Sequence, residues 1–506
     1  MKKFNKDKYL KKLKIRRWLQ SNSRSLYIGV SCLFVCIIGL YFAYSKFFVK
    51  QEIEVVRTTV GEFTTGDIVL NVYIDNEKVD AAPKKGAGYK FDQISCDNDA
   101  EATWNSDTWN LLVTKITRKT KCDIYFKKIV SKVPDIIASV DTTGKCPTVN
   151  DDGSVSVTAV EATNGYLCKA KDAYGDSYYY RGNVTNNYVK FGEWQVRKYF
   201  GYYSDTSNAY QMYDSLEECQ NASSYNKKCA VGIDIGTPMY WRIIRINGDG
   251  SVRVIYDGTT AHANGESSSD RQIGTSVFND GYRYDELVNL RNYDNAHVGY
   301  MYGKVRASYA ETHANTNNST IKTYLDAWYE NNIKGTSNEQ YVKDNLFCND
   351  RSFSPGNSGT GAGTSSTSYN WASWHTSKIN LKCPQQNDAF TVSDTTNGNG
   401  ALTYGVGLVT TDEIVLAGGW SSVNSNYYLY SGQYYWTMSP LGFYDYYARE
   451  RSVSSGGNAT VDDAHGGGRD YVMNSYGTRP VLNLSSDVLK NGNGTASDPY
   501  RISLTS

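Results

Sequence analysis

Cysteine is the residue type in this chain whose number and spacing most clearly indicate chemistry. The sequence contains 10 cysteines, of which Cys32 and Cys36 lie in one apolar run. The other eight cysteines are an even number, which is typical of disulfides in an exported chain. Such a set can pair in many ways, but the wide gaps favour pairing between neighbours in the sequence: Cys96 with Cys122, Cys146 with Cys168, Cys219 with Cys229, and Cys348 with Cys383.

Zinc binding is the alternative use of these cysteines, and their spacing argues against it. No CxxC pair occurs, and the 5 histidines stand in separate segments, whereas a structural zinc site needs closely spaced ligands. The sequence therefore predicts no metal site and no cofactor.

Catalytic motifs of the common hydrolase and nucleotide-binding classes do not occur in the sequence. HExxH, GxSxG, GxxxxGKS and GxxxxGKT are all missing, and the glycine-rich run Gly359–Thr364 has no lysine after it. Asp412 and Glu413 are adjacent carboxylates, which could suggest an acid–base pair. Adjacent side chains on a helix do not face each other, so the favoured interpretation is a capped helix start after Thr410. We predict no catalytic residue.

Charge is distributed unevenly along the 506 residues. The whole chain carries a net charge of +1, while Met1–Arg24 contains ten Lys or Arg and one Asp. That tail has nine net positive charges, so the rest of the chain carries eight net negative charges. A nucleic-acid binder with a generally basic surface is therefore excluded. The hydrophobic share of 40% also excludes wholesale disorder.

The run Ser25–Ser45 has no charged residue and would span roughly 31 Å as a helix, about the thickness of a bilayer core. The basic residues before it predict a cytoplasmic N-terminus and a single-pass signal-anchor in the cell membrane, with an extracellular ectodomain. A cleaved signal peptide is the alternative, although its apolar region would be shorter. Residues 1–24 would be the cytoplasmic tail, 25–45 the transmembrane anchor, and 46–57 a stalk.

Two folded regions are expected after the stalk. Residues 58–130 alternate apolar and polar side chains in short runs, which predicts a small antiparallel β-domain. Residues 141–506 are rich in Tyr, Asn, Ser and Gly and contain no second linker, which predicts one large domain.

Local signals within the large domain predict a few elements. Met239–Ile246 and Val252–Asp257 flank a turn rich in Asn, Asp and Gly, which predicts a hairpin rather than a calcium loop. Ser319–Gly335 has a cap, an apolar face and a terminating glycine, as expected of a helix. Further strands are expected at Tyr434–Pro440, Thr478–Leu484 and Tyr500–Leu504.

Six segments together resemble an uncharacterised ectodomain family of anchored bacterial surface proteins: Tyr178–Val184, Tyr240–Gly258, Ser319–Tyr329, Gly407–Gly419, Trp436–Pro440 and Tyr476–Leu489. That family is in turn remotely similar to the formylglycine-generating-enzyme branch of the C-type-lectin-like fold. The resemblance covers roughly residues 141–506, with an insertion near Phe191–Pro238. It implies an α+β architecture with irregular loops on a small antiparallel core. The resemblance does not imply the activity of the formylglycine-generating enzymes. Those enzymes use a cysteine pair near the C-terminus, and this chain has no cysteine after Cys383.

Aromatic residues are the feature that points to binding. The chain has 43 Tyr, mostly in polar, glycine-rich surroundings, and tyrosine is enriched at interfaces. In the C-type-lectin-like fold the loops before the last strands form the ligand face, which the resemblance places between Phe443 and Tyr476. It implies seven ligand-binding residues: Tyr444, Tyr446, Tyr447, Arg449, Arg451, Asp470 and Tyr471. The alternative is a polar surface loop whose tyrosines only cover the fold.

These observations lead to the expectation of a membrane-anchored bacterial surface protein. Its non-catalytic lectin-like domain would bind an extracellular glycan or protein, as an adhesin does. The alternatives are an enzyme of the formylglycine-generating or wall-hydrolase type and a purely structural envelope protein. Beside the membrane, the expected partner is that ligand, with no nucleic acid.

Overall fold

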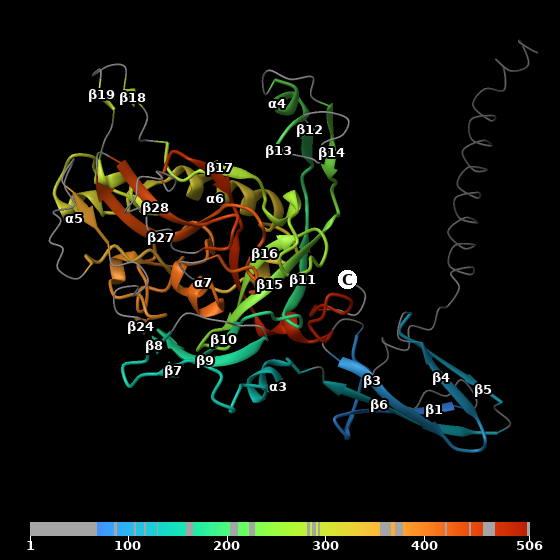
Figure 1. Ribbon diagram of the computed structural model, residues 1–506. Helices are drawn as coiled ribbons and strands as arrows, with labels where there is room; N and C mark the ends of the chain where they lie inside the picture. Colours follow the sequence, from blue (N-terminus) through green and yellow to red (C-terminus); the bar gives the residue numbers. More distant parts are fainter. Residues whose placement is uncertain are drawn as a thin grey trace, which may run out of the picture. The chain divides into compact units, whose positions relative to one another are not determined.

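The structure is a computed structural model (Figure 1). It describes residues 68–84, 89–105, 108–115, 118–128, 130–157, 165–202, 211–221, 228–280, 284–285, 290–291, 294–354, 366–369, 378–419, 423–444, 447–458 and 471–502. The chain divides between Ile129 and Val130 into two compact units, called here the small unit and the large unit.

The predicted membrane anchor finds no support. Within the described ranges, no helix is both long enough and apolar enough to span a bilayer. Residues 1–24, 25–45 and 46–57, expected to be tail, anchor and stalk, lie outside those ranges. The single-pass signal-anchor and the cell-membrane localisation expected from the sequence are therefore not supported.

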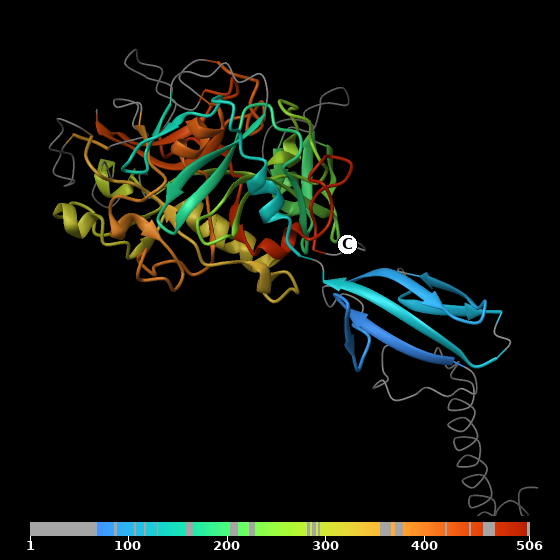
Figure 2. The same ribbon diagram turned by 90° about the horizontal axis from the view of Figure 1, so that it is seen from below.

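The small unit is a four-stranded sheet in the order β2-β1-β6-β3, with a separate β4-β5 hairpin; its strands are blue to cyan in Figure 2. The strands are β1 (Ile68–Ile74), β2 (Glu77–Val79), β3 (Tyr89–Cys96), β4 (Glu101–Asn105), β5 (Asn110–Thr114) and β6 (Thr120–Lys128). Alternate residues of β6 are buried, including Ile124 and Phe126, which pack with Val72 and Trp109.

The expectation of a purely antiparallel small domain is wrong. β1 runs parallel to β6, from the pair Ile68 with Thr120 to the pair Ile74 with Phe126. A parallel pair needs a long crossover, and here the segment carrying β2 to β5 provides it. Alternation of apolar and polar residues shows which face a side chain takes, but not the direction in which the neighbouring strand runs.

The large unit is built on a seven-stranded sheet in the order β26-β30-β16-β15-β10-β9, with β11 also pairing with β15. Its strands are β9 (Tyr166–Asp172), β10 (Gly175–Arg181), β11 (Tyr188–Glu193), β15 (Pro238–Ile246), β16 (Val252–Gly258), β26 (Val406–Gly407) and β30 (Val481–Leu484). The predicted hairpin is confirmed as β15 and β16, which pair antiparallel. Every residue of β16 is buried, as in a central strand covered on both faces.

A second, five-stranded sheet carries the segment in which ligand-binding residues are expected. Its order is β17-β29-β27-β23, and β28 pairs with β27. The strands are β17 (Thr275–Val277), β23 (Thr367–Ser368), β27 (Tyr435–Tyr444), β28 (Tyr447–Val453) and β29 (Ser475–Gly477). β27 and β28 pair antiparallel from Tyr435 with Val453 to Tyr444 with Tyr447.

The other strands of the large unit are short and form small local sheets. β7 (Thr148–Val149), β8 (Val155–Ser156) and β24 (Lys378–Ile379) form one, and β12 (Lys198–Tyr202), β13 (Gln211–Tyr213) and β14 (Lys228–Ile233) form another. The remaining pairs are β18 (Tyr284–Asp285) with β19 (Leu290–Arg291), β20 (Met301–Tyr302) with β21 (Asn317–Asn318), and β22 (Phe347–Cys348) with β25 (Ala389–Phe390).

The described residues form five short α-helices: α3 (Val133–Ala138), α4 (Leu216–Asn221), α5 (Tyr309–Thr312), α6 (Thr320–Asn332) and α7 (Thr411–Ala417). The single-turn 3-10 helices are η1 (Ser269–Arg271), η2 (Asn295–His297), η3 (Glu339–Tyr341), η4 (Gln386–Asp388) and η5 (Ser486–Leu489). The predicted helix after Ser319 is confirmed as α6, which Ser319 caps by accepting a bond from the Lys322 N–H.

The α+β class expected for the protein is wrong, because 39% of the described residues are in strands and only 15% are in helices. Several segments that read as irregular loops form strands of only two residues, such as β22 and β23. Strands this short show no alternation that could reveal them in a sequence.

The prediction that the cysteines outside the apolar run form disulfides is confirmed. The bonds are Cys96–Cys122, Cys146–Cys168, Cys219–Cys229 and Cys348–Cys383. Each joins neighbours in the sequence, and the loops that they close span 10 to 35 residues. Disulfides in this number are typical of a protein that folds in an oxidising compartment.

Buried arginines cross-link the interior of the large unit. The Asp257 carboxylate is fully buried and accepts hydrogen bonds from Arg271 Nη2 and Arg479 Nη2, each at 2.7 Å. Arg242, also fully buried, donates from Nε to Asn187 Oδ1 at 2.7 Å. Buried charges are tolerated only when they are paired or hydrogen-bonded. Because Asp257 belongs to β16, its bonds also connect this strand to segments far away in the sequence.

Candidate ligand-binding site

The seven residues expected to bind a ligand are only partly described by the structure. Tyr446 and Asp470 lie outside the described residues, and Tyr444 ends β27 with its side chain undescribed. The four others belong to β28 or lie beside it: Tyr447, Arg449, Arg451 and Tyr471. These four are the part of the expected site that can be placed.

Tyr447 and Tyr471 come together although 23 positions separate them in the sequence. Their rings stack with centroids 4.3 Å apart and an interplanar angle of 26°. An isolated antiparallel bridge between Arg449 and Tyr471 and a hydrogen bond from Val472 N–H to Ala448 O hold the two segments together. Both rings are half-buried, so each keeps part of its surface accessible.

Arg449 packs against the Tyr471 ring from the interior of the large unit. Its guanidinium carbon lies 5.1 Å from the centre of the Tyr471 ring, within cation–π range. The side chain is only 7% exposed, so it contacts the ring from within the fold. Arg449 therefore positions a tyrosine and presents little surface of its own to a ligand.

Arg451 lies deeper still, at 2% exposure, in the interior of the large unit. Glu450, which points to the opposite face of β28, is fully buried as well, and burial raises its pKa well above the usual range. Both faces of this part of β28 are therefore covered. Only the Tyr447 end of the strand reaches the surface.

A second stacked pair lies at the far end of β27. The Tyr434 and Tyr476 rings have centroids 5.1 Å apart, and the Trp436 ring lies 4.7 Å from that of Tyr476. Asn474 Nδ2 donates to the Tyr476 hydroxyl at 3.1 Å. Sequence reasoning missed this pair, and only the general abundance of tyrosine could have indicated it.

The interpretation of Asp412 and Glu413 as the capped start of a helix agrees with the structure, in which both lie in the first turn of α7 and Glu413 forms the capping box. Thr410 caps α7 by accepting a bond from the Glu413 N–H, while the Glu413 side chain accepts one from the Thr410 N–H. Glu413 also lies 3.2 Å from Arg245 Nε and 2.5 Å from Arg253 Nε. These ion pairs outweigh the cost of burying the carboxylate and hold the pKa of Glu413 below its usual value.

Asp412 lines a cavity of about 20 Å³ together with a different carboxylate, Asp350. Burial, followed by the charges of Asp350 and Glu413, raises the pKa of Asp412 to about 8. Burial likewise raises the pKa of Asp350 to about 6. Two carboxyls with raised pKa can serve as acid and base, but a cavity of this size holds about one water molecule. The pair can hold a proton, and the described residues around it leave space for nothing larger than a water molecule.

The three histidines within the described ranges lie in the interior at 1–6% exposure: His262, His297 and His313. His262 Nε2 lies 2.9 Å from Asp270 and Nδ1 lies 3.0 Å from Glu266. Burial lowers the pKa of His262, but the bonds to the two carboxylates outweigh burial and raise it above its usual value. His375 and His465 fall outside those ranges.

Metal binding has no candidate group in the described part of the chain, where no three or more His, Cys, Asp or Glu side chains are placed to hold an ion. The described geometry thus offers a surface tyrosine pair, a proton-holding carboxyl pair and a set of structural ion pairs. Comparisons with protein-family models, with curated proteins and with solved structures find no match to this chain.

Proposed function

We propose that the large unit is a non-catalytic binding module whose ligand is a glycan, held on the stacked pair Tyr447 and Tyr471. The observation that carries the proposal is this pair itself: two half-buried rings, stacked at 4.3 Å and backed by a buried guanidinium. A sugar ring has an apolar face and polar hydroxyls, and a tyrosine offers it an apolar ring surface with a hydroxyl at the edge.

Rigidity supports a binding role for these rings. Tyr471 is fixed by its backbone bridge to Arg449 and by the cation–π contact beneath its ring. Side chains already ordered in the free protein lose little conformational entropy on binding, which improves affinity. Loose tyrosines that only cover a fold would not need a buried arginine behind them.

A non-catalytic role is proposed because the cavity that the carboxyls of Asp350 and Asp412 line has room for about one water. Glycoside hydrolysis would need two carboxyls on either side of a bound sugar. Asp350 and Asp412 line their small cavity together with the Cys348 end of a disulfide and the ion-paired Glu413, so no sugar fits between them.

The test is a glycan-array screen of the full chain, purified with its disulfides formed. Wild type is compared with Tyr447→Ala/Tyr471→Ala and with the control Tyr434→Ala, which removes one ring of the other stacked pair. We expect the double variant to lose at least about tenfold in affinity for any glycan that wild type binds. The control should bind as wild type does.

Two outcomes would overturn the proposal. Retained binding in the double variant would place the site elsewhere, and failure of wild type to bind any glycan would remove the ligand class. A protein ligand captured through the same two tyrosines would show that the surface is correct and that the glycan assignment is wrong.

A further inference from the structure

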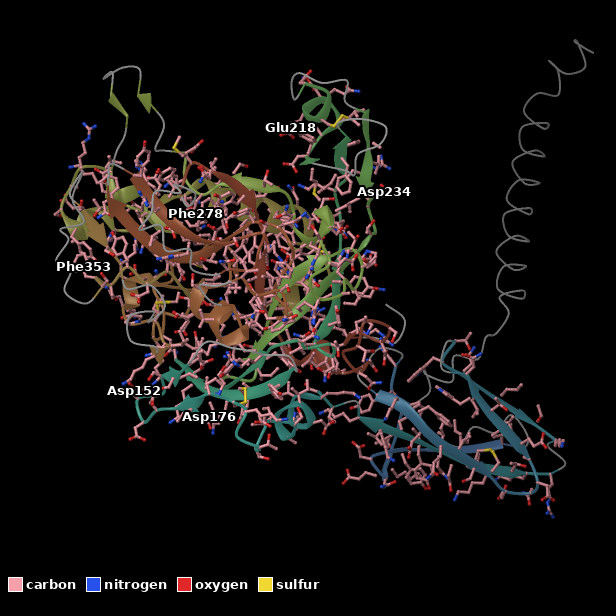
Figure 3. All side chains as sticks on the ribbon, in the orientation of Figure 1. Asp152, Asp176, Glu218, Asp234, Phe278 and Phe353 are labelled. Carbon is pink, nitrogen blue, oxygen red and sulfur yellow. A yellow bond between two sulfur atoms is a disulfide. The ribbon has the colours of Figure 1, made fainter. Side chains whose placement is uncertain are left out.

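The insertion between β11 and β15 builds a separate arm on the large unit. β12, β13 and β14 form its three-stranded sheet, and the Cys219–Cys229 bond ties α4 to β14. Figure 1 shows this arm standing out from the two main sheets, and Glu218 and Asp234 mark it in Figure 3. Its base packs near α6.

A cavity of about 230 Å³ lies at the base of the arm. It is lined by Val196, Arg197, Lys198, Asp214, Tyr324, Ala327, Trp328, Asn331 and Asn332. A water molecule occupies about 30 Å³ of liquid, so this space corresponds to several waters and admits a small organic molecule. It is therefore more than ten times larger than the cavity between Asp350 and Asp412.

Lys198 gives this cavity a buried cation. Its side chain is only 7% exposed, and its ammonium bonds to Asp214, whose own side chain is 59% exposed. The ammonium also lies 5.7 Å from the Trp194 ring and 5.8 Å from the Tyr324 ring. Burying a lysine is costly, and an exposed partner that water also solvates is a weak compensation.

The lining of the cavity consists of charged residues near β12 and a wall of α6 side chains. Of the two cationic lining residues, Arg197 is exposed and pairs with Asp234 at 2.7 Å, whereas Lys198 is buried and pairs with the lining residue Asp214. The α6 wall is held in place because Asn332 donates from Nδ2 to Trp328 O at 2.9 Å and accepts from the Gln195 N–H at 2.9 Å. The cavity is thus preformed, and Lys198 is the buried cation in its lining.

We propose that this cavity binds a small carboxylate-bearing ligand, whose anionic group bonds to Lys198 while its body packs against Tyr324 and Trp328. An incoming carboxylate brings a second charge-assisted hydrogen bond to an ammonium that has three donors. The aromatic wall provides the contact area for the rest of the ligand. This site is separate from Tyr447 and Tyr471, and neither assignment depends on the other.

The probe is sodium glucuronate, titrated into the full oxidised chain and followed by ligand-observed NMR. Glucose serves as the neutral analogue and acetate as the bare anion. We expect glucuronate to saturate one site and to bind at least about tenfold more tightly than either control compound. Equal binding of glucose would overturn the role of charge, and equal binding of acetate would overturn the role of the aromatic wall.

Two variants locate the site. Lys198→Gln removes the cation and should weaken glucuronate binding at least about tenfold. Ala327→Phe fills the cavity from an exposed position on α6 and should abolish binding while leaving the fold intact. If Lys198→Gln fails to fold, judged by near-ultraviolet circular dichroism, Ala327→Phe decides the question.

The matched control is Lys169→Gln, since Lys169 pairs with Asp176 at 2.6 Å on the exposed surface, with both side chains 46% exposed. It should bind glucuronate as wild type does, and so should Tyr447→Ala/Tyr471→Ala. Unchanged binding in Ala327→Phe, or no binding by wild type, would overturn the proposal without bearing on the tyrosine pair.

Discussion

Replacing Asp412 by Asn should stabilise the protein, and more so as the pH rises. Asp412 lies in the first turn of α7, where the helix dipole would favour a charged carboxylate. Burial and the neighbouring Asp350 and Glu413 carboxylates act in the opposite direction and raise its pKa from 3.8 to about 8. Its Oδ1 is buried and accepts no hydrogen bond from any residue that the structure describes. The folded protein therefore favours the neutral acid, which an asparagine imitates.

The sign and size of the effect follow from proton linkage. Between its ordinary pKa of 3.8 and its folded pKa of about 8, the folded state keeps a proton that the unfolded state has lost. The free energy of unfolding therefore falls as pH rises, by about 1.4 kcal/mol per unit for this one group. At pH 7 this amounts to about 4 kcal/mol, or about 3 kcal/mol if partial exposure of the side chain halves the shift. Asp412→Asn removes this loss.

Urea unfolding at pH 4.5 and pH 8, followed by tryptophan fluorescence, measures the difference. We expect the Asp412→Asn and wild-type curves of the large unit to lie close together at pH 4.5 and to separate at pH 8, with the variant more stable. Asp350→Asn is the matched control, because its pKa of about 6 predicts the same direction with a smaller gain. A gain that is the same at both pH values, or a variant less stable at pH 8, would refute the reasoning.

Three further predictions concern the interior and the disulfides. Asp257→Asn removes the counter-charge of two buried arginines and should cost about 3–5 kcal/mol in urea unfolding; a cost below about 1 kcal/mol would contradict the pairing. His262 has a raised pKa, so its pairing with Asp270 stabilises the protein below about pH 6.5 and is lost as pH rises through the folded pKa. His262→Gln should therefore cost more stability at pH 5.5 than at pH 8.5, and an equal cost would argue against a charged histidine. Replacing Cys348 and Cys383 by Ser opens a 35-residue loop and should cost about 4 kcal/mol of unfolding free energy, because the unfolded chain gains entropy. An unchanged urea midpoint would contradict this entropic contribution.

Local sequence signals identify several elements of the large unit. The β15–β16 turn, the Ser319 cap of α6 and the capping box at Thr410 are each determined by side chains within about four positions of one another. The order of the cysteines likewise indicates the disulfide pairs, since each closes a loop between neighbours. Such features need no knowledge of the tertiary fold.

Pairing between distant strands has no local signal. The parallel pairing of β1 with β6 joins residues about fifty positions apart, and neither strand contains a residue that determines the direction of its neighbour. The same limit applies to Asp350 and Asp412, whose raised pKa values arise because β22 and α7 bring the two carboxyls to one cavity. The adjacent carboxylate Glu413, which the sequence places beside Asp412, is held by arginines from β15 and β16 instead.

A polar composition does not by itself mark a surface segment in the large unit. Arg449 and Arg451 belong to a segment rich in Tyr, Arg and Ser, yet both are buried. In the large unit, arginine is a structural residue: Arg351 bonds to Asp388 at 2.6 and 2.8 Å, and Arg479 spans Asp257 and the Leu429 carbonyl. A planar guanidinium with five donors can satisfy several acceptors in a crowded interior. In such a fold, polarity alone does not distinguish a ligand-binding residue from a core residue. The candidates for ligand binding are side chains that the buried arginine network leaves accessible, or that it places beside a cavity.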